Sequence, residues 1–151
     1  MRRGAASIVP PWTRDVAPGP GVALLHAFNT RNLEAWRKHL ASDVVVSYPG
    51  LRGGRGPTAA RAYNASLLVA FSDLQFRVVS SATEGDRITT TWSFTGTHDG
   101  DLVTPNRIIP PTSRPARIDG AIVVTLRARL IAMEEAYWDR LDLLTQLGVQ
   151  P

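Results

Sequence analysis

The 151-residue chain contains no cysteine, and Lys38 is the one lysine among its 17 basic residues. The absence of cysteine excludes disulfides, thiolate metal ligands and a cysteine nucleophile. No stretch reaches the roughly eighteen consecutive apolar residues that a membrane helix needs, so we expect no membrane association. The basic start, Met1–Pro11, lacks an apolar segment of signal-peptide length, and we therefore expect a cytoplasmic protein.

Dense clusters of positive charge are also missing. The formal net charge is +4, but the basic residues are spread from Arg2 to Arg140, and the nearest approach to a cluster is Arg52-Gly53-Gly54-Arg55. A surface that binds nucleic acid usually combines basic clusters with interleaved aromatic residues. We therefore expect no nucleic-acid partner.

The common sequence signatures of nucleophilic catalysis and of cofactor binding do not occur in this chain. It has no Gly-x-Ser-x-Gly nucleophile elbow, no phosphate-binding loop and no dinucleotide-binding fingerprint. His98-Asp99-Gly100-Asp101 brings nitrogen and oxygen ligands together, but it lacks a second histidine motif and the calcium-loop pattern. We expect neither a metal ion nor an organic cofactor.

The periodicity of apolar residues changes near the middle of the chain from helical to alternating. The first half predicts helices over Val22–Phe28, Leu33–Leu40 (with Asn32 as N-cap) and Ala59–Phe71, a strand over Val44–Tyr48, and a glycine-rich loop over Leu51–Gly56. The second half predicts strands over Gln75–Ser81, Arg87–Gly96, Arg117–Arg127 and Ile131–Trp138, a proline-rich loop over Asp99–Pro115, and a closing helix over Asp142–Leu147.

Helices followed by a run of strands are typical of an α+β fold. We expect a curved antiparallel sheet that forms a cone closed by the N-terminal helices. A flexible tail is predicted over residues 1–17 and a single domain over residues 18–151. Such a cone leaves a cavity between its layers, which suits an apolar small molecule.

Asp139 is the first candidate for catalysis, because it lies where an apolar strand gives way to the closing helix. A carboxyl group held against apolar walls has a raised pKa, which suits proton transfer. Strand alternation places His98 on the buried face of its strand, at the mouth of the cavity. The two side chains would form an acid–base pair. The alternatives are a helix cap for Asp139 and a solvated loop position for His98.

The same alternation predicts the lining of the cavity. Glu135, Tyr137 and Met133 share a strand face with Asp139, so they should point into the pocket with it unless a bulge intervenes. Glu135 would then need a neutralising partner such as Arg117 or Arg127. Further residues expected to hold flat rings or line the pocket are Trp92, Phe94, Phe76 and Tyr48.

Six short stretches occur in a definite order between Val22 and Val149: Phe28–Trp36, Phe71–Phe76, Glu84–Arg87, Gly96–His98, Pro110–Thr112 and Trp138–Gly148. Their order and spacing resemble the SnoaL-like polyketide cyclases of the nuclear-transport-factor-2-like superfamily. The resemblance implies closure of a ring in an aromatic polyketide by an intramolecular aldol reaction without a cofactor. It also implies that Asp139 is the acid/base, that His98 orients the substrate, and that homodimers form through the outer face of the sheet.

The chain departs from the pattern of this family at three places. Glu135 stands where many relatives carry tryptophan, Ala128-Arg129 replaces the usual Asp-Gly or similar hairpin turn, and the loop between His98 and Pro110 is longer than expected. These changes alter the pocket and its lid. The alternatives to a cyclase are therefore a cofactorless hydroxylase of an anthracycline-type intermediate and a ligand-binding member of the superfamily without catalysis.

Overall fold

The computed structural model describes residues 19–150, so the tail predicted over residues 1–17 lies outside the described residues. The elements are α3 (Ala23–Thr30), α4 (Leu33–Arg37), β1 (Leu40–Tyr48), β2 (Leu51–Arg55), α5 (Gly56–Ala70), β3 (Gln75–Glu84), β4 (Arg87–Thr97), β5 (Leu102–Val103), β6 (Ile108–Ile109), β7 (Pro115–Arg127), β8 (Leu130–Trp138) and α6 (Arg140–Gln146). None of the helices in this part of the chain has the length and apolar character of a membrane span.

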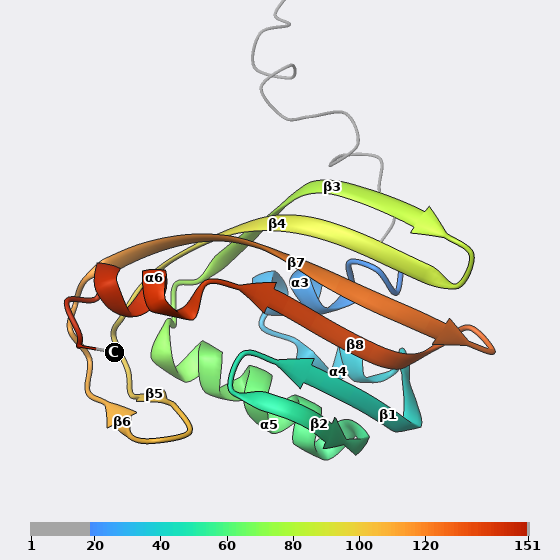
Figure 1. Ribbon diagram of the computed structural model, residues 1–151, viewed down its shortest axis with the longest axis horizontal. Coiled ribbons are helices and arrows are strands. Elements are labelled where there is room, and N and C mark those ends of the chain that lie inside the picture. The colour runs from blue at the N-terminus through green and yellow to red at the C-terminus, as the bar shows by residue number, and fades with distance from the viewer. Residues whose placement is uncertain (1–18, 151) are drawn as a thin grey trace, which may run out of the picture.

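A curved six-stranded sheet in the order β2-β1-β8-β7-β4-β3 arches over the helices (Figure 1). The predicted α+β fold is confirmed, but the sheet is mixed, because β1 pairs with β8 in parallel. Leu51–Arg55, predicted to be part of a loop, is the edge strand β2, since backbone pairing does not require large side chains. The predicted proline-rich loop contains a second, two-stranded sheet of β5 and β6.

The concave face of the sheet carries the core. Thr90, Trp92 and Phe94 of β4 are buried, as the alternation predicts, and the neighbouring strand β7 buries Ile118 and Ile122 on the same face. Each apolar side chain removed from water contributes about 25 cal/mol per Å² of buried surface. The helices α3, α4 and α5 therefore stay packed against this face.

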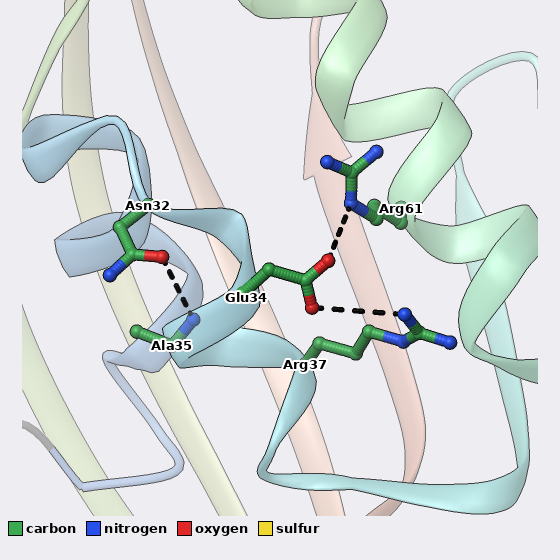
Figure 2. Close-up of polar contacts among 5 residues, drawn as sticks. All are labelled: Asn32, Glu34, Ala35, Arg37 and Arg61. Atoms are coloured by element: carbon green, nitrogen blue, oxygen red, sulfur yellow. Dashed lines mark hydrogen bonds and ion pairs between the residues drawn. The ribbon is translucent and has the colours of Figure 1, made fainter.

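The short helix α4 has a capping hydrogen bond at its N-terminus and ion pairs on one side (Figure 2). The side chain of Asn32 accepts a hydrogen bond from the Ala35 amide at 3.3 Å, which confirms the predicted cap. Glu34 forms ion pairs with Arg37 at 3.7 Å and with Arg61 of α5 at 3.2 Å. Exposed pairs of this kind contribute about 0–1 kcal/mol each. Apolar burial therefore holds α4 more firmly than these pairs do.

Strand β8 contains a bulge. Thr125 of β7 pairs with Met133, whereas the next residue, Leu126, pairs with Ile131, so Ala132 is an extra residue in β8. Ile131 and Glu134 are both fully buried, although simple alternation would put them on opposite faces. The bulge therefore reverses the inward and outward positions along the rest of the strand.

Gly120 of β7 has no side chain, and the Trp92 indole occupies the space that a side chain there would fill. A Cβ atom at Gly120 would lie 2.5 Å from Trp92 Cζ2 and 2.6 Å from the carbonyl oxygen of Tyr137. Because that carbonyl belongs to the paired strand, Gly120→Ala is expected to lower the free energy of unfolding by about 1–3 kcal/mol. Chemical denaturation measures this loss, with Ala121→Ser as the neutral control. An unchanged stability for Gly120→Ala would contradict the close packing.

Candidate functional site

An apolar cavity of about 50 Å³, which we call the inner cavity, lies between the sheet and the helices. Its lining residues are Leu24, Leu25, Phe28, Tyr48, Tyr63, Asn64, Leu67, Phe71, Phe76, Trp92, Phe94, Ile118, Ile122, Ala136, Trp138 and Leu143. The ring of Phe76 meets those of Trp92 and Phe94 edge-on, at centroid distances of 5.0 and 5.3 Å. The structure thus brings four sequence-predicted residues to one cavity: Tyr48, Phe76, Trp92 and Phe94.

A larger hollow of about 370 Å³, the vestibule, lies beside the inner cavity. It is bounded by Pro49–Leu51, the side of α5 between Ala59 and Leu67, Leu102–Pro105, Trp138, and α6 from Arg140 to Leu144. Tyr63, Leu67, Trp138 and Leu143 line both spaces. The vestibule reaches the roughly 300–1,000 Å³ of small-molecule pockets, whereas the inner cavity has room for only about one or two water molecules.

Glu134 is a fully buried carboxylic acid behind the wall of the inner cavity. Its Oε2 accepts a hydrogen bond from the Trp36 indole at 3.2 Å, and its Oε1 accepts one from the Tyr48 hydroxyl at 2.7 Å. The Tyr48 oxygen in turn accepts a hydrogen bond from the Asn64 amide at 3.2 Å. Because Tyr48 and Asn64 line the cavity, a hydrogen-bond chain connects that cavity to the buried acid.

The surroundings of Glu134 favour its protonated form. Burial raises its pKa to about 7, and the hydrogen bonds from Tyr48 and Trp36 oppose this only in part. Burial, together with the nearby Glu134 carboxylate, also raises the pKa of Tyr48, so the phenol keeps its proton. A carboxyl group with a pKa near 7 can give or take a proton at neutral pH. Glu134 is therefore the titrating member of the network.

Asp139 lies at the surface as the N-cap of α6. Its Oδ1 accepts a hydrogen bond from the Asp142 amide at 2.9 Å, and its side chain is exposed. It lines neither the inner cavity nor the vestibule. The prediction that apolar walls enclose this carboxyl is wrong, and the capping alternative is confirmed. The free amides at the start of a helix bind a carboxylate, and here they hold Asp139 away from the cavity.

The other predicted residues of β8 lie on the outer face of the sheet. Met133 and Tyr137 are 41% and 56% exposed, and the Tyr137 hydroxyl donates a hydrogen bond to Glu135 Oε2 at 2.8 Å. The prediction that Glu135, Tyr137 and Met133 line the pocket is wrong, because the extra residue Ala132 shifts the alternation. The inward positions belong to Glu134, Ala136 and Trp138.

His98 is fully buried, so the alternative of a solvated loop histidine is wrong. Its Nδ1 accepts a hydrogen bond from the Thr112 amide at 3.2 Å, which places the proton of the neutral ring on Nε2. Burial lowers the pKa of His98. No residue in the described part of the chain pairs with Nε2, and His98 lines neither the cavity nor the vestibule. The imidazole therefore anchors the following loop, and no hydrogen bond joins it to Asp139 within residues 19–150.

Sequence reasoning missed the buried network because alternation placed Glu134 on the outer face. One signal was available. Two adjacent acids in an apolar strand, Glu134 and Glu135, put one carboxyl inward in either phase. An inward carboxyl requires hydrogen-bond partners. Among residues 19–150, no three His, Asp or Glu side chains converge to hold a metal ion.

The curved sheet, the helices packed on its concave face and the apolar cavity between them define an α+β protein with a small-molecule pocket. Within that class, the profile of the SnoaL-like polyketide cyclases matches residues 22–147, and the chain belongs to this family. No protein of curated function matches the chain by sequence.

Solved structures agree with this family. AclR from Streptomyces galilaeus, provisionally assigned as a hydroxylase, is 22% identical with a TM-score of 0.74, over 87% of this chain and 80% of AclR. A provisionally assigned SnoaL-like polyketide cyclase from Jannaschia sp. CCS1 is 20% identical with a TM-score of 0.75, over 91% and 99% of the two chains. IdmH from Streptomyces antibioticus, provisionally a polyketide cyclase, is 26% identical with a TM-score of 0.69, over 85% and 94%.

Glu134 is expected to make the protein less stable as the pH rises. Its pKa is about 7 in the folded protein against an ordinary value of 4.5, so the folded state holds this proton more tightly than the unfolded state. The resulting stabilisation is complete below about pH 4.5 and is lost between pH 4.5 and 7, by about 3 kcal/mol. Unfolding free energies of the wild type and Glu134→Gln at pH 5 and pH 8 measure this effect. Relative to the wild type, Glu134→Gln should have a higher free energy of unfolding at pH 8 than at pH 5. Parallel pH dependences of the two proteins would refute the assignment.

Proposed function

We propose that this protein is a cofactor-independent enzyme that closes a ring in an aromatic polyketide by acid–base catalysis. One observation carries the proposal: the buried carboxyl of Glu134 is joined through Tyr48 to an apolar cavity with aromatic walls. Membership of the SnoaL-like polyketide cyclase family supports the class of reaction.

The two spaces suit a flat and mostly apolar substrate. The inner cavity offers a substrate the aromatic rings of Phe76, Trp92 and Phe94. Each aromatic pair contributes about 0.5–1.5 kcal/mol of binding energy beyond the burial of its surface. The vestibule takes the part of the molecule that the narrow inner cavity cannot hold. The inner cavity is too small for a ring as it stands, so the proposed reaction requires Trp138 and Leu143, which line both spaces, to shift when the substrate binds.

Tyr48 and Glu134 act as a proton relay. Tyr48 O accepts a proton from a substrate carbon flanked by carbonyls, while its own proton passes along the 2.7 Å hydrogen bond to the Glu134 carboxylate. No free tyrosinate forms, so the raised pKa of Tyr48 is no obstacle. The effective base is Glu134, whose pKa of about 7 suits neutral conditions.

Ring closure then needs no oxidant. The enolate carbon attacks a carbonyl carbon of the same molecule, a carbon–carbon bond forms, and the resulting alkoxide takes back the proton through Tyr48. Asn64 donates to the Tyr48 oxygen and keeps the hydroxyl oriented. General acid–base catalysis of this kind contributes about 10²–10⁴-fold, which is sufficient for an already acidic carbon–hydrogen bond.

A hydroxylase is the second candidate, favoured by the similarity to AclR. There the same deprotonated substrate would react with molecular oxygen instead of with its own carbonyl group. Incubation of the purified protein with an anthraquinone-type intermediate separates the possibilities. Ring closure under nitrogen identifies a cyclase, turnover in air alone identifies a hydroxylase, and binding without turnover identifies a ligand-binding protein.

Loss of the buried acid should remove the chemistry without removing the fold. Glu134→Gln preserves the size of the side chain, so we expect the rate of ring closure to fall about 10²–10⁴-fold. The rise of kcat/KM with pH through about 7 should disappear in this variant, because the effective base is gone. Steady-state kinetics between pH 5 and 9 measures both effects.

Two further variants complete this test. Tyr48→Phe removes the hydroxyl that donates to Glu134 and should cause a similar loss of rate. Asp139→Asn is the matched control, because asparagine caps a helix as well as aspartate does and the site is on the surface. A wild-type rate for Glu134→Gln, or a collapse of activity in Asp139→Asn alone, would refute the relay.

We also propose that two copies of the chain associate through the outer face of β8. Met133 and Tyr137 are exposed there, and Val123 of the neighbouring strand is apolar and lies between them in register. Exposed apolar residues grouped on one face are typical of interaction sites. Met133 and Tyr137 form the proposed centre of the contact, to which Val123, only 7% exposed, adds little surface.

The oligomeric state tests this face. Met133→Lys places a charge at its centre and should convert a dimer into a monomer in sedimentation velocity measurements. Val69→Lys is the control, since Val69 is an exposed apolar residue of α5 and lies elsewhere. A monomeric wild type would contradict the proposal.

A further inference from the structure

Arg140 stands out in the lining of the vestibule. It is the one charged residue among the side chains that bound this hollow, which are otherwise apolar apart from Tyr63, Ser66 and Thr104. Arginine keeps its charge at all ordinary pH values. A guanidinium beside apolar walls is less well hydrated than one in open water, so its attraction for an anion is stronger.

No carboxylate of the described residues neutralises Arg140. The ion pairs within residues 19–150 involve Arg37, Arg61 and Arg127. The two acids nearest to Arg140 in sequence have other partners: Asp139 caps the helix, and Asp142 Oδ2 accepts a hydrogen bond from Gln146 at 3.1 Å. The vestibule therefore presents a positive group without a counter-ion from its own lining.

The guanidinium lies at the wall of the vestibule, beside the turn between β1 and β2. Arg140 Nη1 is 3.8 Å from the position that a Cβ atom at Gly50 would take, and Gly50 belongs to the turn between β1 and β2. Tyr63 and Arg140 both line the vestibule. The Tyr63 hydroxyl itself donates to the Pro49 carbonyl at 2.7 Å, and its ring lines both the vestibule and the inner cavity.

We infer that Arg140 binds an anionic group of the substrate, a carboxylate or an ionised phenol, while the attached rings extend from the vestibule toward Tyr48. This inference rests on the proposed function and adds a substrate class to it, namely acidic aromatic polyketides. A carboxylate matches the fork of the guanidinium with two parallel hydrogen bonds. One anchored end would also fix which carbon of the ring system faces the relay.

Binding of two matched probes tests the inference in the intact protein. Anthraquinone-2-carboxylate carries the anion, and 2-methylanthraquinone has the same rings without charge. Quenching of tryptophan fluorescence reports both, because Trp138 lines both spaces. We expect the wild type to bind the carboxylate about tenfold more tightly, which corresponds to about 1.4 kcal/mol. Added salt should reduce this preference.

Variants assign the preference to one side chain. Arg140→Gln should remove the tenfold preference and leave the affinity for the neutral probe unchanged, which also shows that the pocket is intact. Arg140→Lys should keep part of the preference, because it retains the charge but not the fork. Arg77→Gln, an exposed arginine of β3, is the charge-matched control and should behave as the wild type.

The outcomes separate this inference from the function on which it rests. Equal affinities of the wild type for the two probes, or a preference that survives Arg140→Gln, would overturn the role of Arg140 and leave the proposed enzyme standing. Failure of the wild type to bind either probe would overturn both.

Discussion

The hydrogen bonds that the Glu134 carboxyl accepts from Trp36 and Tyr48 are the interaction on which the rest of the structure depends. They join α4, β1 and β8, and Asn64 extends the network to α5. A buried acid without such partners costs several kcal/mol, so the elements are held in the arrangement that supplies them. The same burial raises the pKa of Glu134 to about 7, which is the property on which its proposed role in proton transfer rests.

One inserted residue decides which acid occupies this place. Without the bulge at Ala132, Glu135 would point inward and Glu134 would face the outside of the sheet. The parallel pairing of β1 with β8 then sets Val46 opposite Glu134 and brings Tyr48, two residues further on, to the same buried face. The burial of Glu134 and its contact with Tyr48 thus follow from backbone geometry as much as from residue type.

The two adjoining spaces differ in size and in the chemistry of their walls. The inner cavity is narrow and has apolar and aromatic walls, with Tyr48 among its lining residues. The vestibule is wider and carries the charge of Arg140, so it suits the polar end of a long molecule. In a low-dielectric site both a fixed charge and a fixed hydroxyl act more strongly than they would in water. A ligand that spans both spaces would be oriented before any proton moves.

Periodicity alone was sufficient to predict the helices, most of the strands and the inward face of β4. The reason is that buried apolar side chains recur every 3.6 residues in helices and every 2 residues in strands. Trp92 and Phe94 followed from the same rule, whereas Tyr48 and Phe76 were expected in the pocket as aromatic residues of predicted strands. The bulge, the parallel pairing of β1 with β8 and the strand β2 did not follow from periodicity, because they depend on contacts between segments far apart in the chain. Asp139 shows the limit well: its position in the sequence suits either a cap or a catalytic acid, and only the packing of α6 decided that its carboxylate binds the helix amides.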